Sequence, residues 1–259
     1  MPTGVAHDMA SQVRGRVRVE RGQKRVRVYL GGRPIVDTAG PLYVWENPHY
    51  PTYYVPITDV QSGVLVPTGD TDHSPSRGEG QVYTVKSGTA EAPKAAVRYA
   101  DSPIPELRDA VRLDWDAMDA WFEEDEEVYV HARDPYSRVD ILPSSRSVRV
   151  ELDGVVLAES THANVLFETG LPPRWYIPKV DVRFDLLEPT ASVTRCPYKG
   201  TAEYWSADVN GRRVEDIAWS YRTPLPESER VAGLVCFYSE RTDLFIEGEL
   251  QERPKTPFS

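Results

Sequence analysis

Residues 147–158 read SVRVELDGVVLA and carry the clearest structural signal in the chain. The first six residues alternate polar and apolar side chains, which is the period of a half-buried β-strand. Asp153-Gly154 follows, and a two-residue turn of this composition between apolar runs is the strongest short-range signal of a β-hairpin. The segment therefore predicts a strand over 147–152, a tight turn and a partner strand over 155–158.

The same pattern occurs earlier in the chain, because residues 25–36 read RVRVYLGGRPIV and Val26 lies 122 residues before Val148. A fixed repeat of this kind indicates duplicated structural units. The offset joins further identical residues: Gly32/Gly154, Glu46/Glu168, Tyr54/Tyr176, Asp59/Asp181, Pro75/Pro197, Gly78/Gly200 and Tyr99/Tyr221. It also pairs Arg77 with Lys199 and Trp115 with Phe237. Chance does not hold one register over this length, so the chain contains two copies of one domain with a seam near Ser144-Ser145.

This register divides the chain into an N-terminal extension with a basic strand (1–24), a first and more divergent repeat domain (25–130), an ordered bridge (131–146) and a second repeat domain (147–259). The expected fold class is mainly β, with two tandem, homologous, compact β-sheet domains and few short helices. The many Pro and Gly residues, 22 and 17, favour short elements joined by turns.

One helix is predicted over 105–123, where Leu107, Val111, Trp115, Met118 and Phe122 recur at helical spacing. A strand in this window is the alternative, because Leu113 and Trp115 align with the strand expected over 235–237. A short helix is expected at the matching place in the second repeat, over 224–230.

The 259 residues contain no apolar stretch long enough to span a membrane, and the net charge is −10. We therefore expect a soluble, cytoplasmic protein that binds neither membrane nor, as its main partner, nucleic acid. The basic run 13–28 could contact nucleic acid, but the acidic run 123–127 could equally pair with it inside the molecule. The five His and two Cys lack metal-ligand spacing, so neither a metal nor a cofactor is expected.

The strongest candidate for a reactive side chain is the thiol of Cys196, in the segment Arg195-Cys196-Pro197-Tyr198-Lys199-Gly200. Pro and Gly frame a tight turn, and the basic residues on either side of the thiol favour its nucleophilic thiolate form. Cys196 is then either a nucleophile with Lys199 as charge stabiliser or proton donor, or a buried thiol in a turn whose lysine points to solvent. The first repeat has Ser74 in place of the thiol, so only the second would be catalytically competent.

Two pairs of acids persist in both copies. Glu46 and Glu168 are either general acid–base groups or satisfied carboxylates in the fold. For Asp59 and Asp181 the structural interpretation, a carboxylate that holds a turn, is favoured.

The segment 131–140, HARDPYSRVD, is too rich in charged and aromatic residues for a plain linker. We expect an ordered bridge that docks the two repeats against each other. It is either a salt-bridged connector or one wall of a shared cleft.

The second copy, from about 147 to 249, carries a long set of recognisable segments: Val148-Arg149-Val150, Asp153-Gly154, Ala158-Glu159-Ser160, Phe167-Glu168, Trp175-Tyr176-Ile177-Pro178, Asp181-Val182, Cys196-Pro197-Tyr198-Lys199-Gly200, Tyr204-Trp205, Ala218-Trp219-Ser220-Tyr221 and 233–238. With these segments it resembles the family called domain of unknown function 427. The first copy, from about 25 to 130, resembles it with departures. The resemblance implies a bacterial protein with a β-tent, or Mss4-like, fold. The zinc cysteines of related folds are absent here.

The leading functional hypothesis is an unidentified small molecule bound in a pocket of the C-terminal domain. Tyr176, Trp205, Trp219 and Tyr221 would form its walls, and Glu168, Cys196 and Lys199 its polar groups. As an enzyme, the protein would use Cys196 as nucleophile, Lys199 to stabilise negative charge and Glu168 as acid–base. Further expected ligand contacts are Asp181, His131, Arg133, Glu46 and Tyr54. The alternative is a non-catalytic structural or protein-interaction module.

Overall fold

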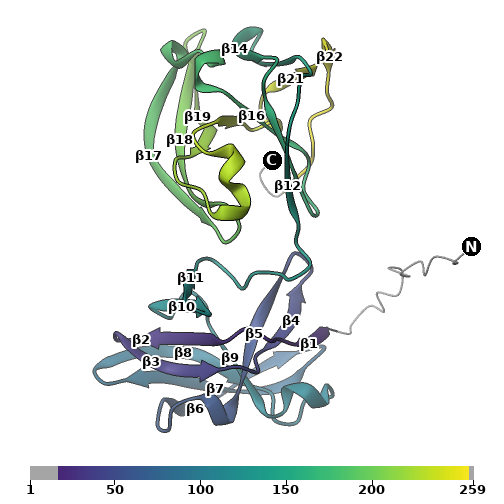
Figure 1. The fold of residues 1–259 in the computed structure, drawn as a ribbon. Helices are drawn as coiled ribbons and strands as arrows, with labels where there is room; N and C mark the ends of the chain where they lie inside the picture. Colours follow the sequence, from purple (N-terminus) through teal and green to yellow (C-terminus); the bar gives the residue numbers. More distant parts are fainter. Residues whose placement is uncertain (1–16, 257–259) are drawn as a thin grey trace, which may run out of the picture. The chain divides into compact units, whose positions relative to one another are not determined.

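The computed structural model describes residues 17–256, so the start of the predicted basic strand at Val13 lies outside the described residues. The chain divides into two compact units between Ala132 and Arg133. Each unit consists of a seven-stranded and a four-stranded antiparallel sheet, and the two sheets pack face to face (Figure 1). Within the described residues, no helix is both long and apolar enough to cross a membrane.

The N-terminal unit has the sheet orders β1-β4-β5-β9-β8-β7-β6 and β11-β10-β2-β3. Its elements are β1 (Arg18–Arg21), β2 (Val26–Leu30), β3 (Arg33–Thr38), β4 (Leu42–Asn47), β5 (Tyr50–Pro56), η1 (Ile57–Asp59), β6 (Leu65–Ser74), β7 (Gly78–Ser87), β8 (Ala90–Arg98), η2 (Pro105–Leu107), β9 (Ala110–Leu113), β10 (Ala120–Glu123) and β11 (Glu126–Val128).

The C-terminal unit repeats this topology with the orders β12-β15-β16-β20-β19-β18-β17 and β14-β13-β21-β22. Its elements are β12 (Val139–Pro143), β13 (Val148–Leu152), β14 (Val155–Ser160), β15 (Asn164–Glu168), β16 (Arg174–Ile177), η3 (Lys179–Asp181), η4 (Phe184–Leu186), β17 (Leu187–Cys196), β18 (Gly200–Val209), β19 (Arg212–Tyr221), η5 (Pro226–Val231), β20 (Val235–Phe237), β21 (Asp243–Ile246) and β22 (Glu249–Leu250).

Both predicted hairpins form. The turn between β13 and β14 places Asp153 and Gly154 at φ 51° and 76°, and Gly31 and Gly32 stand at 63° and 69° between β2 and β3. Two successive residues at positive φ give the turn whose twist matches that of the flanking strands. The hydrophobic faces of these hairpins then close over the larger sheet.

The repeat register of 122 residues is kept from β2 and β13 through β8 and β19, and then shifts before β9 and β20. Tyr54 of β5 pairs with Arg112, whereas the equivalent Tyr176 of β16 pairs with Cys236, which makes the offset 124. The expected equivalence of Trp115 and Phe237 is therefore wrong, because Phe237 corresponds to Leu113.

The predicted helix over 105–123 is also wrong. That window holds the single 3-10 turn η2, strand β9 and strand β10, so the alternative of a strand holds for Leu113. Val111, Leu113 and Trp121 all face the core between the sheets. Two strands and the turn that joins them gather these residues on one side, which imitates helical spacing. The short helix expected over 224–230 does form, as η5.

Strand alternation gives the seven-stranded sheet two different faces. Tyr53 and Val55 point into the core between the sheets, and Tyr54 points into a second cluster on the outer face. The C-terminal unit repeats this arrangement, with Ile177 in the inner core and Tyr176 in the outer cluster. The outer face of the larger sheet is where the predicted polar residues assemble.

Strands β1 and β12 occupy equivalent edges and pair with β4 and β15, so each repeat starts earlier than the period-2 pattern indicates. The basic segment also finds partners inside the N-terminal unit. Lys24 lies 2.5 Å from Glu123, and Arg27 lies 2.7 Å from Asp125, so the pairing with the acidic run is confirmed.

Candidate functional site

The turn that carries the predicted thiol joins β17 to β18 in the C-terminal unit. Cys196 pairs with Gly200 across the end of the hairpin, and Gly200 stands at φ 94°, a conformation that favours glycine. The carbonyl of Lys199 accepts a 3.2 Å hydrogen bond from the amide of Leu225. The position of the lysine is thus fixed by the backbone on both sides.

Residues of the expected bridge fasten the same turn. The Nε of Arg133 donates to the carbonyl of Pro197 at 2.8 Å, and the amide of Asp134 donates to the Tyr198 hydroxyl at 2.7 Å. Burial raises the pKa of Tyr198 to about 12, so its hydroxyl stays protonated. Arg133 therefore contacts the candidate site through the backbone of the turn.

Lys199 forms an ion pair with Glu168 at the end of β15. The Nζ and Oε2 atoms lie 2.5 Å apart, and the side chains are 11% and 9% exposed. Of the two predicted alternatives for the lysine, the one in which it points to solvent is thus wrong. A largely buried ion pair adds little net stability, because its attraction is offset by the cost of desolvating both charges. Removal of either charge would nevertheless leave the other buried without a partner.

Two phenols, Tyr176 of β16 and Tyr221 of β19, lie beside this ion pair. Burial raises the pKa of Tyr176 and of Tyr221 well above the usual value, and the nearby carboxylate of Glu168 adds to the effect in both. Both hydroxyls therefore remain protonated. The indole of Trp219 donates to the Tyr176 hydroxyl at 3.2 Å. The outer face thus brings together six of the predicted residues: Glu168, Tyr176, Cys196, Lys199, Trp219 and Tyr221.

Two predicted residues of the same domain lie elsewhere. Trp205 points to the inner face of the sheet and packs edge-on against Phe184, with a centroid separation of 5.8 Å. Asp181 accepts a 2.6 Å hydrogen bond from the Ser160 hydroxyl beside η3. The Asp181 carboxylate thus ties η3 to the end of strand β14 through a side-chain hydroxyl, and its role in a ligand site stays a prediction.

His131 belongs to the N-terminal unit, where its ring stacks on Tyr50 with a centroid separation of 4.1 Å. The expected cleft shared by the two repeats stays a prediction.

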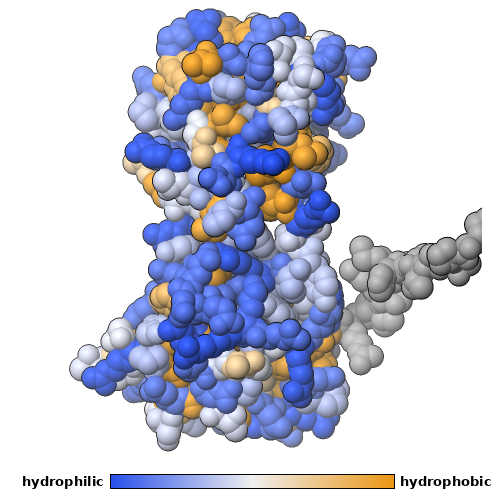
Figure 2. All heavy atoms as spheres, in the orientation of Figure 1, coloured by the Kyte–Doolittle hydropathy of each residue, from blue (hydrophilic) through white to orange (hydrophobic). Residues whose placement is uncertain are grey.

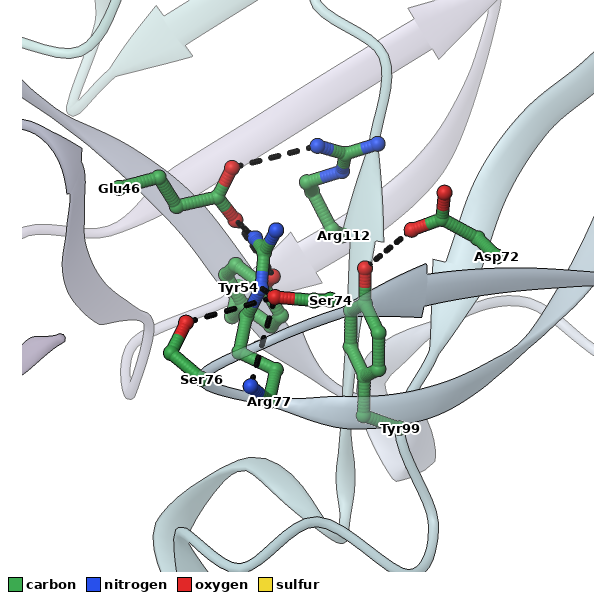
Figure 3. A network of polar contacts seen from close by, with 8 residues as sticks. All are labelled: Glu46, Tyr54, Asp72, Ser74, Ser76, Arg77, Tyr99 and Arg112. Atoms are coloured by element: carbon green, nitrogen blue, oxygen red, sulfur yellow. Dashed lines mark hydrogen bonds and ion pairs between the residues drawn. The ribbon is translucent and has the colours of Figure 1, made fainter. Parts of the chain in front are cut away.

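The N-terminal unit contains the same arrangement with different chemistry, and Figure 3 shows its side chains pointing toward one another. Glu46 of β4 accepts a 2.5 Å hydrogen bond from the Tyr54 hydroxyl, pairs with Arg112 at 3.2 Å and contacts Arg77. The Arg77 guanidinium also donates to Ser74 and to Tyr54, both at 2.9 Å. Every member of this cluster is satisfied by another.

Tyr99 closes the cluster on its other side (Figure 3). Its hydroxyl donates to Asp72, and its ring lies 5.0 Å beneath the Arg77 guanidinium. Burial, together with the hydrogen bond to Asp72, raises the pKa of Tyr99 to about 12. Burial alone would lower the pKa of Arg77, but Tyr54 and Glu46 outweigh it, and the net shift is upward.

Arg112 is a site residue that the sequence pattern missed. Its equivalent in the second repeat is Cys236, and the register shift of two residues hides this relationship. Cys236 is fully buried, which raises the pKa of its thiol to about 12. This second thiol is therefore protonated and shielded from solvent.

No set of three or more His, Cys, Asp or Glu residues between 17 and 256 is arranged to hold a metal ion. Residues 18–124 and 140–248 each match the model of a protein family described as domain of unknown function DUF427. No curated protein sequence matches the chain.

Proposed function

The chain belongs to the DUF427 family, with two copies of the domain in tandem, and we propose that its second copy binds a small molecule at the Glu168–Lys199 pair. The observation that carries the proposal is the direct contact of these two charges in a solvent-poor setting beside Cys196 and two buried phenols. Convergent polar groups against aromatic walls are the ordinary make-up of a small-molecule site.

The ammonium group of Lys199 has three N–H donors, and Glu168 takes one of them. The remaining donors and the phenol hydroxyls suit a ligand that carries a carbonyl, carboxylate or phosphate oxygen. Tyr176, Trp219 and Tyr221 would supply the walls. Trp205 and Asp181 are left out of this proposal, because they lie on the other face of the sheet and beside η3.

Any chemistry at this site would use Cys196 as nucleophile, Lys199 to stabilise developing negative charge and Glu168 as acid–base. The first repeat lacks these properties, since Ser74 replaces the thiol and the guanidinium of Arg77 does not give up its proton. In the first repeat, Glu46 and Tyr54 would at most contact a bound ligand without any reaction. The proposal thus confines covalent chemistry to the second repeat.

A structural role is the second candidate. It is favoured by the hydrogen bonds that fix the turn and by the neutralisation of Lys199 by Glu168, which reduces the positive field expected around Cys196. From the family resemblance we also propose a β-tent, or Mss4-like, fold in a bacterial protein, and from the composition a cytoplasmic setting.

Alkylation by iodoacetamide at pH 7, followed by intact mass, separates the two candidates. Cys236 is 1% exposed, so the modified fraction reports on Cys196. The matched control is the double variant Ser74→Cys/Cys196→Ser, which moves the thiol into the equivalent site of the first repeat. A functional site gives modification of wild type faster than that of glutathione and faster than that of the control. A wild-type rate at or below that of glutathione would overturn the nucleophile.

A further inference from the structure

A groove of about 530 Å³ opens in the C-terminal unit, away from the cluster described above. Its apolar wall comprises Phe167, Pro173, Trp175, Leu244 and Ile246. Trp175 and Ile246 belong to the inner core, whereas Glu168 and Lys199 meet at the other face of the sheet. On the face drawn in Figure 2, hydrophobic residues are exposed on this unit between hydrophilic ones, and Phe167 is 41% exposed.

The first repeat explains why the groove exists. At the equivalent place, the rings of Trp115 and Trp121 stack with centroids 4.5 Å apart and an interplanar angle of 5°. The pairing of β9 and β10 with their neighbours makes Ser239 the equivalent of Trp115 and Leu244 the equivalent of Trp121. Two large rings are thus replaced by smaller side chains, and both replacements line the groove.

The charge of the groove favours a cation. Glu247, Glu249 and Glu252 line it, against the single basic residue Arg146. Neither Glu249 nor Glu252 forms an ion pair within residues 17–256. Opposite charges at close range select one sign of ligand over the other.

The aromatic wall also accepts a cation already. The guanidinium of Arg146 lies 4.5 Å from the ring centroid of Trp175. Such a contact is favourable because the face of an indole carries negative charge density. A ligand with an ammonium or guanidinium head could occupy the same ring face or continue the stack.

We propose that this groove binds an organic cation with an apolar body, of the alkyl- or arylalkyl-ammonium or -guanidinium class. The body would lie against Phe167, Leu244 and Ile246, and the head would lie among Glu249, Glu252 and the Trp175 ring. The volume is within the range of small-molecule sites. This site shares no residue with the Glu168–Lys199 cluster.

Calorimetric titration of the full chain with three probes of one stem tests the proposal: 4-phenylbutylamine, 4-phenylbutanol and 4-phenylbutyrate. The amine should bind at least threefold tighter than the alcohol, and the carboxylate should bind weakest. Equal affinity for the three probes, or a preference for the carboxylate, would overturn the assignment.

Two variants locate the binding. Ser239→Trp restores one ring of the first repeat and should weaken amine binding tenfold or more. Glu249→Gln/Glu252→Gln changes only exposed side chains, so it should fold normally and weaken the amine about two- to fivefold, the range of an exposed charge pair. Unchanged amine affinity in both variants would place binding elsewhere. Cys196→Ser should leave amine affinity unchanged, which keeps this test independent of the proposed function.

Discussion

The two repeats keep the same acid and the same two phenols but surround them differently. In the first, Glu46 is held by Tyr54, Arg77 and Arg112, and these groups also bond one another. In the second, Glu168 faces one lysine, and Cys236 replaces the second arginine. In the first site the charged and polar side chains therefore bond one another, whereas the second site keeps the amine of Lys199 and the thiol of Cys196. The difference agrees with the proposal that the first cluster braces its sheet, whereas the second serves a ligand or a reaction.

The two repeats also differ on the inner side of the larger sheet, in how completely side chains fill the space there. The first repeat fills it with stacked tryptophans, and the second leaves a groove. On the outer side of the same sheet, Arg174 and Glu240 form a bidentate ion pair at 2.6 and 2.7 Å, with side chains 8% and 0% exposed, and the Arg174 guanidinium lies 5.6 Å from the Trp219 ring centroid. The equivalent positions of the first repeat hold Thr52 and the exposed Asp116, so this buried ion pair is a difference between the two repeats.

The largest effect is expected at this ion pair. Glu240→Gln leaves the Arg174 charge buried without its partner, which costs about 3–5 kcal/mol in the free energy of unfolding. Hydrogen exchange followed in peptides of each repeat should show faster opening in the C-terminal unit only. The matched control is Asp116→Asn, at the exposed equivalent position of the first repeat, and should change neither unit. Equal protection of wild type and Glu240→Gln would contradict the asymmetry.

The same pair gives a pH dependence. Burial opposes ionisation of Glu240, but hydrogen bonds from Arg174 and Thr256 outweigh it, and the folded-state pKa is lowered from 4.5. The stabilisation is therefore fully present above pH 4.5 and is lost as the pH falls through the folded-state value. The stability gap between wild type and Glu240→Gln should accordingly narrow in acid. A gap that stays constant below pH 4.5 would exclude this carboxylate as the cause.

A smaller effect should separate the two outer clusters. Glu46→Gln leaves two arginines without their carboxylate, and we expect a loss of about 3 kcal/mol. Glu168→Gln strands only Lys199 and should cost about 1.5 kcal/mol. Urea unfolding of the two variants measures both. The reverse order would mean that the second cluster, and not the first, is the structural brace.

The smallest effect is expected at the two hairpin turns. A Cβ at Gly31 would lie 2.7 Å from the Cβ of Ala90, whereas its equivalent Asp153 pairs with Arg212 at 2.7 Å. Gly31→Asp should therefore cost about 1–3 kcal/mol, and Asp153→Gly, which removes only an exposed ion pair, less than about 0.5 kcal/mol. Thermal denaturation of both variants checks this. Equal losses would show that the steric difference at Ala90 and Arg212 has no effect.

Much of the fold follows from local sequence. The alternation of polar and apolar residues and the turns at Gly31-Gly32 and Asp153-Gly154 predict both hairpins. The repeat register identifies Glu168 and Lys199 as the equivalents of Glu46 and Arg77. The helix over 105–123 fails because a turn between two strands places apolar residues at helical intervals.

The rest depends on pairing between distant strands. Arg112 is hidden because the register shifts by two residues before β9, and no local pattern records that shift. The groove is hidden because Ser239 and Leu244 are ordinary residues until they are compared with the stacked Trp115 and Trp121. Strand β1 (Arg18–Arg21) lies within the predicted basic strand, but no local pattern records its pairing with β4.

The alkylation rate of Cys196 in the double variant Glu168→Gln/Lys199→Met tests most directly whether the second cluster serves chemistry. Removal of both charges leaves no buried ion unpaired, so the free energy of unfolding of the variant should lie within about 1 kcal/mol of the wild-type value. We expect its Cys196 to react at least fivefold more slowly than in wild type. A variant that loses several kcal/mol of stability while its thiol reacts at the wild-type rate would show that the pair only braces the fold.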